Sequence, residues 1–220
     1  MRVLPLLLTL LPFAKAAVAP APPAATRTDY FFRYVGGGAL LDQQRLRGNI
    51  SFDFFSPGAV NPPFNPADHF NRVSTNASVP SDEAILNVVP THPHPPPVPG
   101  YYGLSDKEGI KDALRLIATY HPDTEGAGFQ YTGWELRESN GPSGKVLLRY
   151  SGDADGEWRW IARREKVFDG ALDKELDKWV PWYVRPSAAN AQVLGDWEYE
   201  RVDLELEVVK EGEISLAARA

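Results

Sequence analysis

Tryptophan is concentrated in the second half of the chain, where all six tryptophans lie after residue 130. Trp158 and Trp160 are two positions apart, so on a strand they would share one face, with Arg159 between them. Together with Trp134 they would form an aromatic wall that stacks a sugar ring or encloses a hydrophobic ligand, while Arg159 orients an anionic group. The simpler interpretation of the same rings is a large aromatic core, which a domain without disulfides needs.

Glu135 is the best-placed candidate for a catalytic acid. It lies beside Trp134 in the sequence, and an apolar wall raises the pKa of a neighbouring carboxyl. A second set of carboxylates, Asp203, Glu205 and Glu207, alternates along a later segment with about 6.6–7 Å between successive members of one strand face. That spacing falls in the range of a glycosidase pair, but the wet face of an amphipathic strand explains the row more simply.

Two histidines are the metal-ligand candidates. His92-Pro93-His94 brings two imidazoles close together, and imidazole is a common ligand of copper and zinc. Because no third ligand is fixed by spacing, a solvated proline-rich loop explains the segment better, and we expect no cofactor. The acidic segment 153–157 resembles the opening of a calcium loop, but Arg164 stands where the bidentate glutamate is needed, so the sequence favours a turn.

The first sixteen residues have the layout of a secretory signal peptide. Arg2 is followed by an apolar run and then by Ala14-Lys15-Ala16, which predicts cleavage after Ala16 and a secreted, extracellular protein. The run is too short to span a bilayer as a helix. Two glycosylation sequons, at Asn49 and Asn76, fit the same compartment.

Composition narrows the classes of partner. The chain has 29 acidic and 23 basic residues, a formal net charge of −6, which argues against nucleic acid and against anionic membranes. The rest of the chain has no second long apolar run, so no membrane-spanning helix is predicted. The chain contains no cysteine, so its fold depends on its core alone, and thiol catalysis and thiolate metal sites are excluded.

The elements that would position these residues are mostly strands. Residues 17–28 are rich in alanine and proline and are expected to be a disordered leader before a single β-rich domain over 29–220. Residues 56–100 hold more than half of the twenty prolines and are expected to be a long irregular loop, with one short strand over 84–89.

A capping box at Ser105 predicts a helix over 105–120, and apolar spacing predicts a second over 170–180. Alternation predicts strands over 30–35, 49–55, 129–137, 145–150, 158–163 and 202–208, those from 129 to 163 forming an antiparallel meander.

The expected fold class is therefore mainly β or α+β: an antiparallel sheet, sandwich or barrel-like, of roughly six to eight strands with two helices and a long proline-rich loop. The function favoured by secretion, by the sequons and by the lack of a catalytic signature is a non-enzymatic binding protein for a ligand or an extracellular partner. The alternative is a cofactor-independent enzyme with an aromatic-lined pocket, either an isomerase or cyclase for a hydrophobic metabolite or a glycan hydrolase. The bound molecule would be a small hydrophobic compound or a glycan.

Overall fold

The protein is an antiparallel β-structure with very little helix. A computed structural model describes residues 28–47, 70–75, 81–89, 99–138, 146–153, 155–169, 174–210 and 212–213. The helical elements are short: α1 (Gly38–Leu41), the 3-10 turn η2 (Pro122–Thr124) and α2 (Ala191–Gly195). The strands are β1 (Asp29–Gly36), β2 (Arg72–Thr75), β3 (Ser81–Ala84), β4 (Leu86–Val89), β5 (Tyr101–Ser105), β6 (Ala113–Thr119), β7 (Trp134–Glu138), β8 (Val146–Tyr150), β9 (Arg159–Asp169), β10 (Lys174–Val184) and β11 (Tyr199–Val208).

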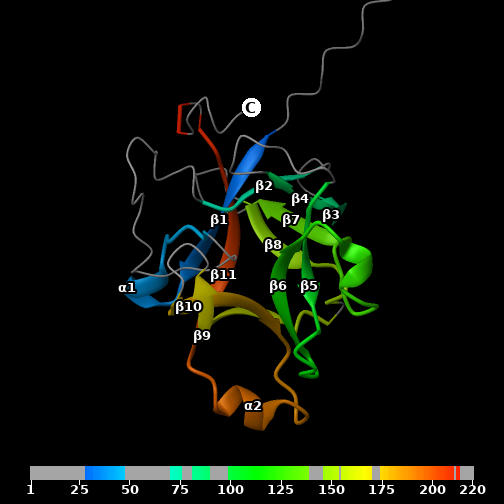
Figure 1. Ribbon diagram of the computed structural model, residues 1–220, viewed down its shortest axis with the longest axis vertical. Coiled ribbons are helices and arrows are strands. Elements are labelled where there is room, and N and C mark those ends of the chain that lie inside the picture. The colour runs from blue at the N-terminus through cyan, green and yellow to red at the C-terminus, as the bar shows by residue number, and fades with distance from the viewer. Residues whose placement is uncertain are drawn as a thin grey trace, which may run out of the picture.

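The strands form one sheet that closes on itself and also branches. Antiparallel ladders run in the order β1-β2-β4-β5-β6-β10-β9-β11, and β11 pairs with β1 to complete a ring (Figure 1). A second series, β8-β7-β3, leaves the ring at β11. Because of this branch the sheet is not a regular barrel. The predicted fold class is confirmed, with more strands than the sequence indicated.

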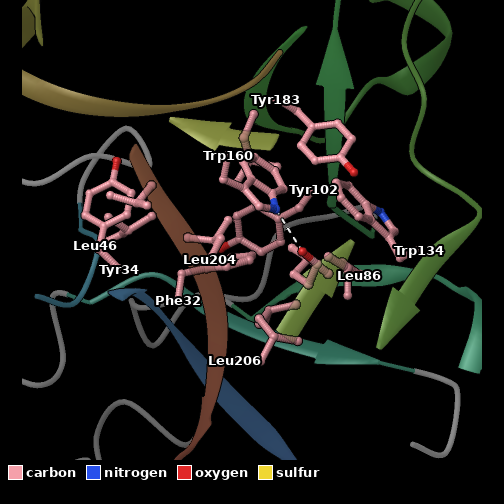
Figure 2. Packing of buried hydrophobic residues seen from close by; sticks show 14 of the residues in the cluster. Phe32, Tyr34, Leu46, Leu86, Tyr102, Trp134, Trp160, Tyr183, Leu204 and Leu206 are labelled. Atoms are coloured by element: carbon pink, nitrogen blue, oxygen red, sulfur yellow. Dashed lines mark hydrogen bonds between the residues drawn. The ribbon is translucent and has the colours of Figure 1, made fainter. Parts of the chain in front are cut away.

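The interior of the ring is filled with aromatic and aliphatic side chains. Trp160 lies at its centre, with its ring centroid 4.8 Å from that of Tyr183 and 6.5 Å from that of Trp134, against which it stacks (Figure 2). Its indole Nε1 donates a hydrogen bond of 2.8 Å to the carbonyl oxygen of Leu148. The core interpretation of the tryptophans therefore applies to Trp134 and Trp160, which are 0% and 1% exposed.

A second, smaller cluster covers the outside of β9 and β10. Val180 and Trp182 alternate with the inward-facing Trp179 and Tyr183 and pack against Leu194 of α2. In Figure 1, α2 lies at the lower end of the molecule. Among the described residues, no helix is long and apolar enough to cross a bilayer.

Both helices predicted from sequence are wrong, because their segments form strands. β5 ends at Ser105 and β6 begins at Ala113; the turn between them contains Asp112 at φ +57°, a left-handed conformation that no helix continues. The Ser105 hydroxyl accepts a hydrogen bond from the Lys107 N–H within this turn, at 3.3 Å. The described part of 170–180 belongs to β10, which pairs with β9 along the full eleven residues of each strand.

The range expected to be an irregular loop, 56–100, contains three short strands. These are β2, β3 and β4, and the last agrees with the strand expected over 84–89. β2 and β4 pair with each other and complete the ring between β1 and β5. Most of the other residues of that range lie outside the described residues, as do the strand predicted over 49–55, the signal peptide and nearly all of the leader.

The polar face of β11 is not the solvated face expected from its alternation, since it carries a ladder of ion pairs. Arg33 of β1 lies opposite Glu205 in the register, and the two side chains, each 7% exposed, are joined at 2.6 Å. Glu207 bonds Arg45 at 2.9 Å, and Arg45 also reaches Glu213 at 2.7 Å. These carboxylates hold cations that fasten β1 and residues 43–47 to β11, so they are not arranged as a glycosidase pair.

This ladder makes stability depend on pH. Burial raises the pKa of the Glu207 carboxyl, but the hydrogen bond and charge of Arg45 lower it by more, so the net shift is downward. A carboxyl with a lowered pKa in the folded state stabilises above the unfolded value, about 4.3 for glutamate, and loses that contribution as the pH falls through the folded value. We expect urea unfolding to show a free-energy gap between the wild type and Glu207→Gln at pH 7 that narrows as the pH falls below about 4.3. A gap that stays constant as the pH is lowered would contradict this.

Candidate ligand-binding site at the strand fork

The candidate site lies where two strands separate on one edge of β11. Tyr199–Arg201 pair with β9, whereas Glu205 and Leu206 pair with β8 on the same edge. β8 and β9 follow each other in the chain but do not pair, so the predicted meander is wrong at this step. We call this divergence of β8 and β9 the fork. Inside the fork, the Trp160 indole donates a hydrogen bond to the Leu148 carbonyl oxygen, which would otherwise lack a donor where β8 and β9 separate.

An open depression of about 510 Å³ occupies the outer mouth of the fork. That volume is in the usual range of small-molecule sites. Among the described residues the lining carries three arginines and one glutamate together with one tryptophan, one proline and one glycine: Arg149, Gly156, Glu157, Trp158, Arg159 and Pro186. The sequence predicted two of these, Trp158 and Arg159, as parts of a ligand wall.

Trp158 is held in place from behind. Its ring stacks on Tyr183 at a centroid distance of 5.5 Å and an interplanar angle of 20°, and its backbone N–H donates to Asp153 Oδ1 at 3.2 Å. The Tyr183 hydroxyl donates to the other oxygen of Asp153 at 3.1 Å. Burial and the Asp153 carboxylate both raise the pKa of the Tyr183 hydroxyl, which therefore stays protonated as the donor. Trp158 is half-buried, with the rest of its surface at the depression.

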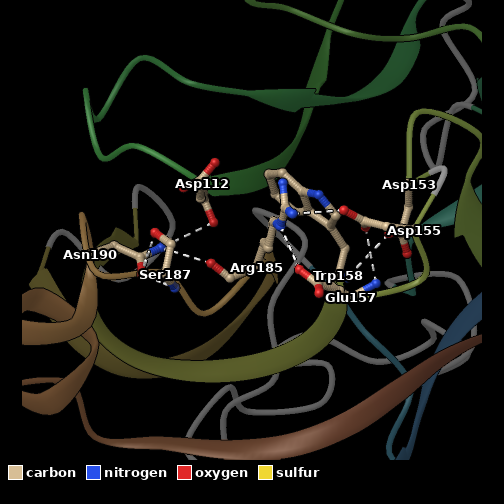
Figure 3. Close-up of polar contacts among 8 residues, drawn as sticks. All are labelled: Asp112, Asp153, Asp155, Glu157, Trp158, Arg185, Ser187 and Asn190. Atoms are coloured by element: carbon tan, nitrogen blue, oxygen red, sulfur yellow. Dashed lines mark hydrogen bonds and ion pairs between the residues drawn. The ribbon is translucent and has the colours of Figure 1, made fainter.

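Arg185 pairs with two of the three acidic residues in the connection between β8 and β9. Its guanidinium bonds Asp155 at 2.7 Å and Glu157 at 2.9 Å (Figure 3). The backbone N–H of Glu157 lowers the pKa of the Asp155 carboxyl, and the charge of Arg185 adds to that shift. The carboxylates of segment 153–157 therefore act in a turn and an ion pair rather than in a calcium loop. Among the described residues, no group of three or more potential ligands is placed to hold a metal ion.

Arg159 differs from the other arginines at the fork. Arg149 bonds Asp203 at 3.1 Å and lies opposite Glu135 in the β7–β8 register, and Arg185 has two carboxylates. Within the described part of the chain, the Arg159 guanidinium has neither an ion pair nor a hydrogen bond, and its Nε is buried without an acceptor. Among the arginines that line the depression, it is the one that has no carboxylate partner in the described part of the chain.

Asn190 anchors the segment that carries Pro186. Its side chain is fully buried, and its Nδ2 donates to the carbonyl oxygens of Lys111, Asp112 and Arg185 at 3.0–3.2 Å. Its Oδ1 accepts the backbone N–H of Ser187 at 3.0 Å (Figure 3). One amide thus fixes the rim of the depression to the turn that precedes β6.

We expect Asn190→Ala to lower the free energy of unfolding by about 2–3 kcal/mol, because it removes a fully buried amide together with its hydrogen bonds to the backbone. Urea unfolding measures the change. Gln192→Ala, at an exposed position of α2, is the matched control and should change stability by no more than about 0.5 kcal/mol. Equal effects of the two substitutions would show that Asn190 does not hold the rim.

The structure separates the remaining predicted site residues. Trp134 and Trp160 lie in the filled interior, whereas Trp158 lies at its edge. Glu135 follows Trp134 on β7 and projects to the opposite face, where it pairs with Arg137. It therefore does not lie against the aromatic cluster. His92 and His94, and the sequons at Asn49 and Asn76, lie outside the described residues.

Sequence reasoning missed Arg149, Arg185 and Pro186. They come from β8 and from the end of β10, and only the separation of β8 from β9 brings them beside Trp158. Pro186 directly after a strand is an ordinary strand terminator, and neither arginine belongs to a motif. No local signal in the sequence distinguished them.

Comparison of the chain with models of protein families, with curated proteins and with solved structures finds no match in any of the three.

Proposed function

We propose that the protein is a secreted, non-enzymatic binding protein that takes a polar ligand, of the kind a glycan presents, at the depression of the fork. The proposal rests on one observation: Trp158 packs against the inner aromatic cluster and also lines an open polar depression. A half-buried tryptophan fixed from behind by Tyr183 and Asp153 is a preorganised surface for a sugar ring. The mostly charged side chains that line the described part of the depression favour a glycan over a hydrophobic metabolite.

Secretion is part of the same proposal. It rests on the signal-peptide layout of residues 1–16 and on the sequons at Asn49 and Asn76. Expression in a eukaryotic host, followed by mass spectrometry of the protein in the medium, should give an N-terminus at Ala17 and added glycan mass at one sequon or both. Retention of the full chain inside the cells would contradict secretion.

The binding proposal is tested with a panel of soluble neutral and acidic oligosaccharides and with the variant Trp158→Ala. We expect at least one member to bind the wild type and to bind Trp158→Ala at least about tenfold more weakly, because the change removes the apolar ring face against which a sugar packs. Trp158→Phe keeps a ring over Tyr183 and should retain most of the affinity.

Two results would contradict the proposal. One is undiminished binding by a folded Trp158→Ala protein, which would move the site elsewhere. The other is chemical conversion of the bound oligosaccharide, detected by mass spectrometry of the recovered ligand, which would make the protein an enzyme.

A further inference from the structure

We infer that the ligand of the fork carries a singly charged acidic group on a sugar ring, a carboxylate or a sulfate ester, which the Arg159 guanidinium binds while the ring stacks on Trp158. The inference rests on the proposed function and names the chemical class of its ligand. Arg159 directly follows Trp158, and both line the same depression.

The state of Arg159 gives the first reason. Its side chain is half-buried and its Nε is out of contact with solvent, yet within the described chain no acceptor reaches the guanidinium. A partly desolvated charge without a partner is unfavourable. An anion in the depression offsets that cost, and a guanidinium presents a planar set of donors that matches a carboxylate or sulfate.

The neighbouring charges give the second reason, because the carboxylates beside the lining arginines bond other partners. Asp203 bonds Arg149, and Asp155 and Glu157 bond Arg185. Asp153 accepts from the Tyr183 hydroxyl and the Trp158 backbone. Glu135 pairs with Arg137. None of these carboxylates pairs with Arg159. The carboxylates of Asp153, Asp155, Glu157 and Asp203 outnumber the cations of Arg149, Arg159 and Arg185 around the depression, so a group with one negative charge meets less repulsion there than a doubly charged phosphate.

The geometry of the loop gives the third reason, since it holds the Trp158 ring and the backbone of Arg159 in place. Gly156 adopts φ +68° in the turn, Asp153 holds the Trp158 backbone, and Arg159 opposite Val184 is the first residue of the β9–β10 ladder. The Trp158 ring and the Arg159 backbone therefore have fixed relative positions before any ligand arrives, which limits the entropy lost on binding. The overall negative charge of the protein acts weakly here, because charges farther away than about 8 Å are largely screened at physiological salt.

The experiment compares three trisaccharides by isothermal titration calorimetry: a galacturonic acid trimer, its neutral methyl ester, and a sulfated galactose trimer. The wild type is compared with Arg159→Gln and with the control Arg164→Gln, which removes the same charge from an exposed arginine that bonds Glu198 and Asp177. We expect the wild type and Arg164→Gln to bind an acidic trimer at least about tenfold more tightly than the ester. Arg159→Gln should lose this preference while keeping its affinity for the ester. The tighter of the two acidic trimers then identifies the charged group.

The outcomes separate this inference from the proposed function. Equal affinity of the wild type for acidic and neutral trimers would overturn the inference and leave the glycan-binding proposal standing. An equal loss of preference in Arg159→Gln and Arg164→Gln would show a general charge effect and overturn the role of Arg159. No binding of any trimer, together with no binding of the wider panel, would overturn the proposed function and the inference with it.

Discussion

Glu205→Ala is expected to lower the free energy of unfolding by about 3–5 kcal/mol, because it leaves the buried Arg33 guanidinium without its carboxylate. Arg33 and Glu205 lie directly opposite each other on β1 and β11, the ladder that closes the ring. Their side chains are 7% exposed and 2.6 Å apart. Glu207 is 3.9 Å from Arg33 but is already bonded to Arg45, so it cannot fully replace Glu205. Guanidinium chloride unfolding measures the loss.

Two further variants make this expectation specific. Glu198→Ala removes a carboxylate that is 61% exposed and pairs with Arg164, and an exposed pair of this kind contributes no more than about 1 kcal/mol. The double variant Arg33→Met with Glu205→Leu removes both buried charges and should recover most of the stability lost in Glu205→Ala. If Glu205→Ala costs no more than Glu198→Ala, the pair does not fasten the closing ladder.

Trp160→Ala is expected to cost about 3–5 kcal/mol through the cavity that it leaves at the centre of the interior. The change also removes the donor to the Leu148 carbonyl, which adds the cost of an unpaired buried acceptor, about 1–3 kcal/mol. Because Trp160 stacks on Trp134 and contacts Tyr183, near-ultraviolet circular dichroism should lose intensity together with stability.

Trp160→Phe separates the two contributions, since it keeps an aromatic ring and removes only the N–H donor and part of the volume. We expect it to lie between the wild type and Trp160→Ala in chemical unfolding. A stability of Trp160→Ala within about 1 kcal/mol of the wild type, well below the cost of emptying a packed core, would contradict the filled interior on which the location of the ligand site depends.

Much of the fold was predictable because strand alternation is strong in β8 and β11, and because β1 is a short aromatic run that ends at three glycines. The two helix predictions failed for a physical reason. In β6 and β10 the apolar residues occupy both strand faces, as Trp179, Val180, Trp182 and Tyr183 do in β10, and such a run contains helical spacings by chance. The inner and outer clusters of the structure use both faces. The spacing of the apolar residues fits a helix as well as a strand, and packing on both faces of the strand decided the structure.

The candidate site was predictable only in part. Trp158 and Arg159 are adjacent in sequence, which on a strand would place them on opposite faces; they line one depression because Trp158 precedes the first residue of β9. Arg149 and Pro186 join them because β8 and β9 pair with different parts of β11, and no local pattern encodes that divergence. Glu135 was assigned to the aromatic wall from its neighbour Trp134, but adjacent residues on a strand face opposite ways, which is why it projects away from the rings.

The measurement that tests the central claim most directly is a proton–nitrogen correlation spectrum of the six tryptophan indoles during titration with the galacturonic acid trimer, each signal assigned by single tryptophan-to-phenylalanine variants. We expect the Trp158 signal to shift with saturation, while the signals of the buried Trp134 and Trp160 keep their positions. A saturable shift of Trp134 and Trp160 with Trp158 unchanged would place the ligand inside the ring and contradict a site at the fork.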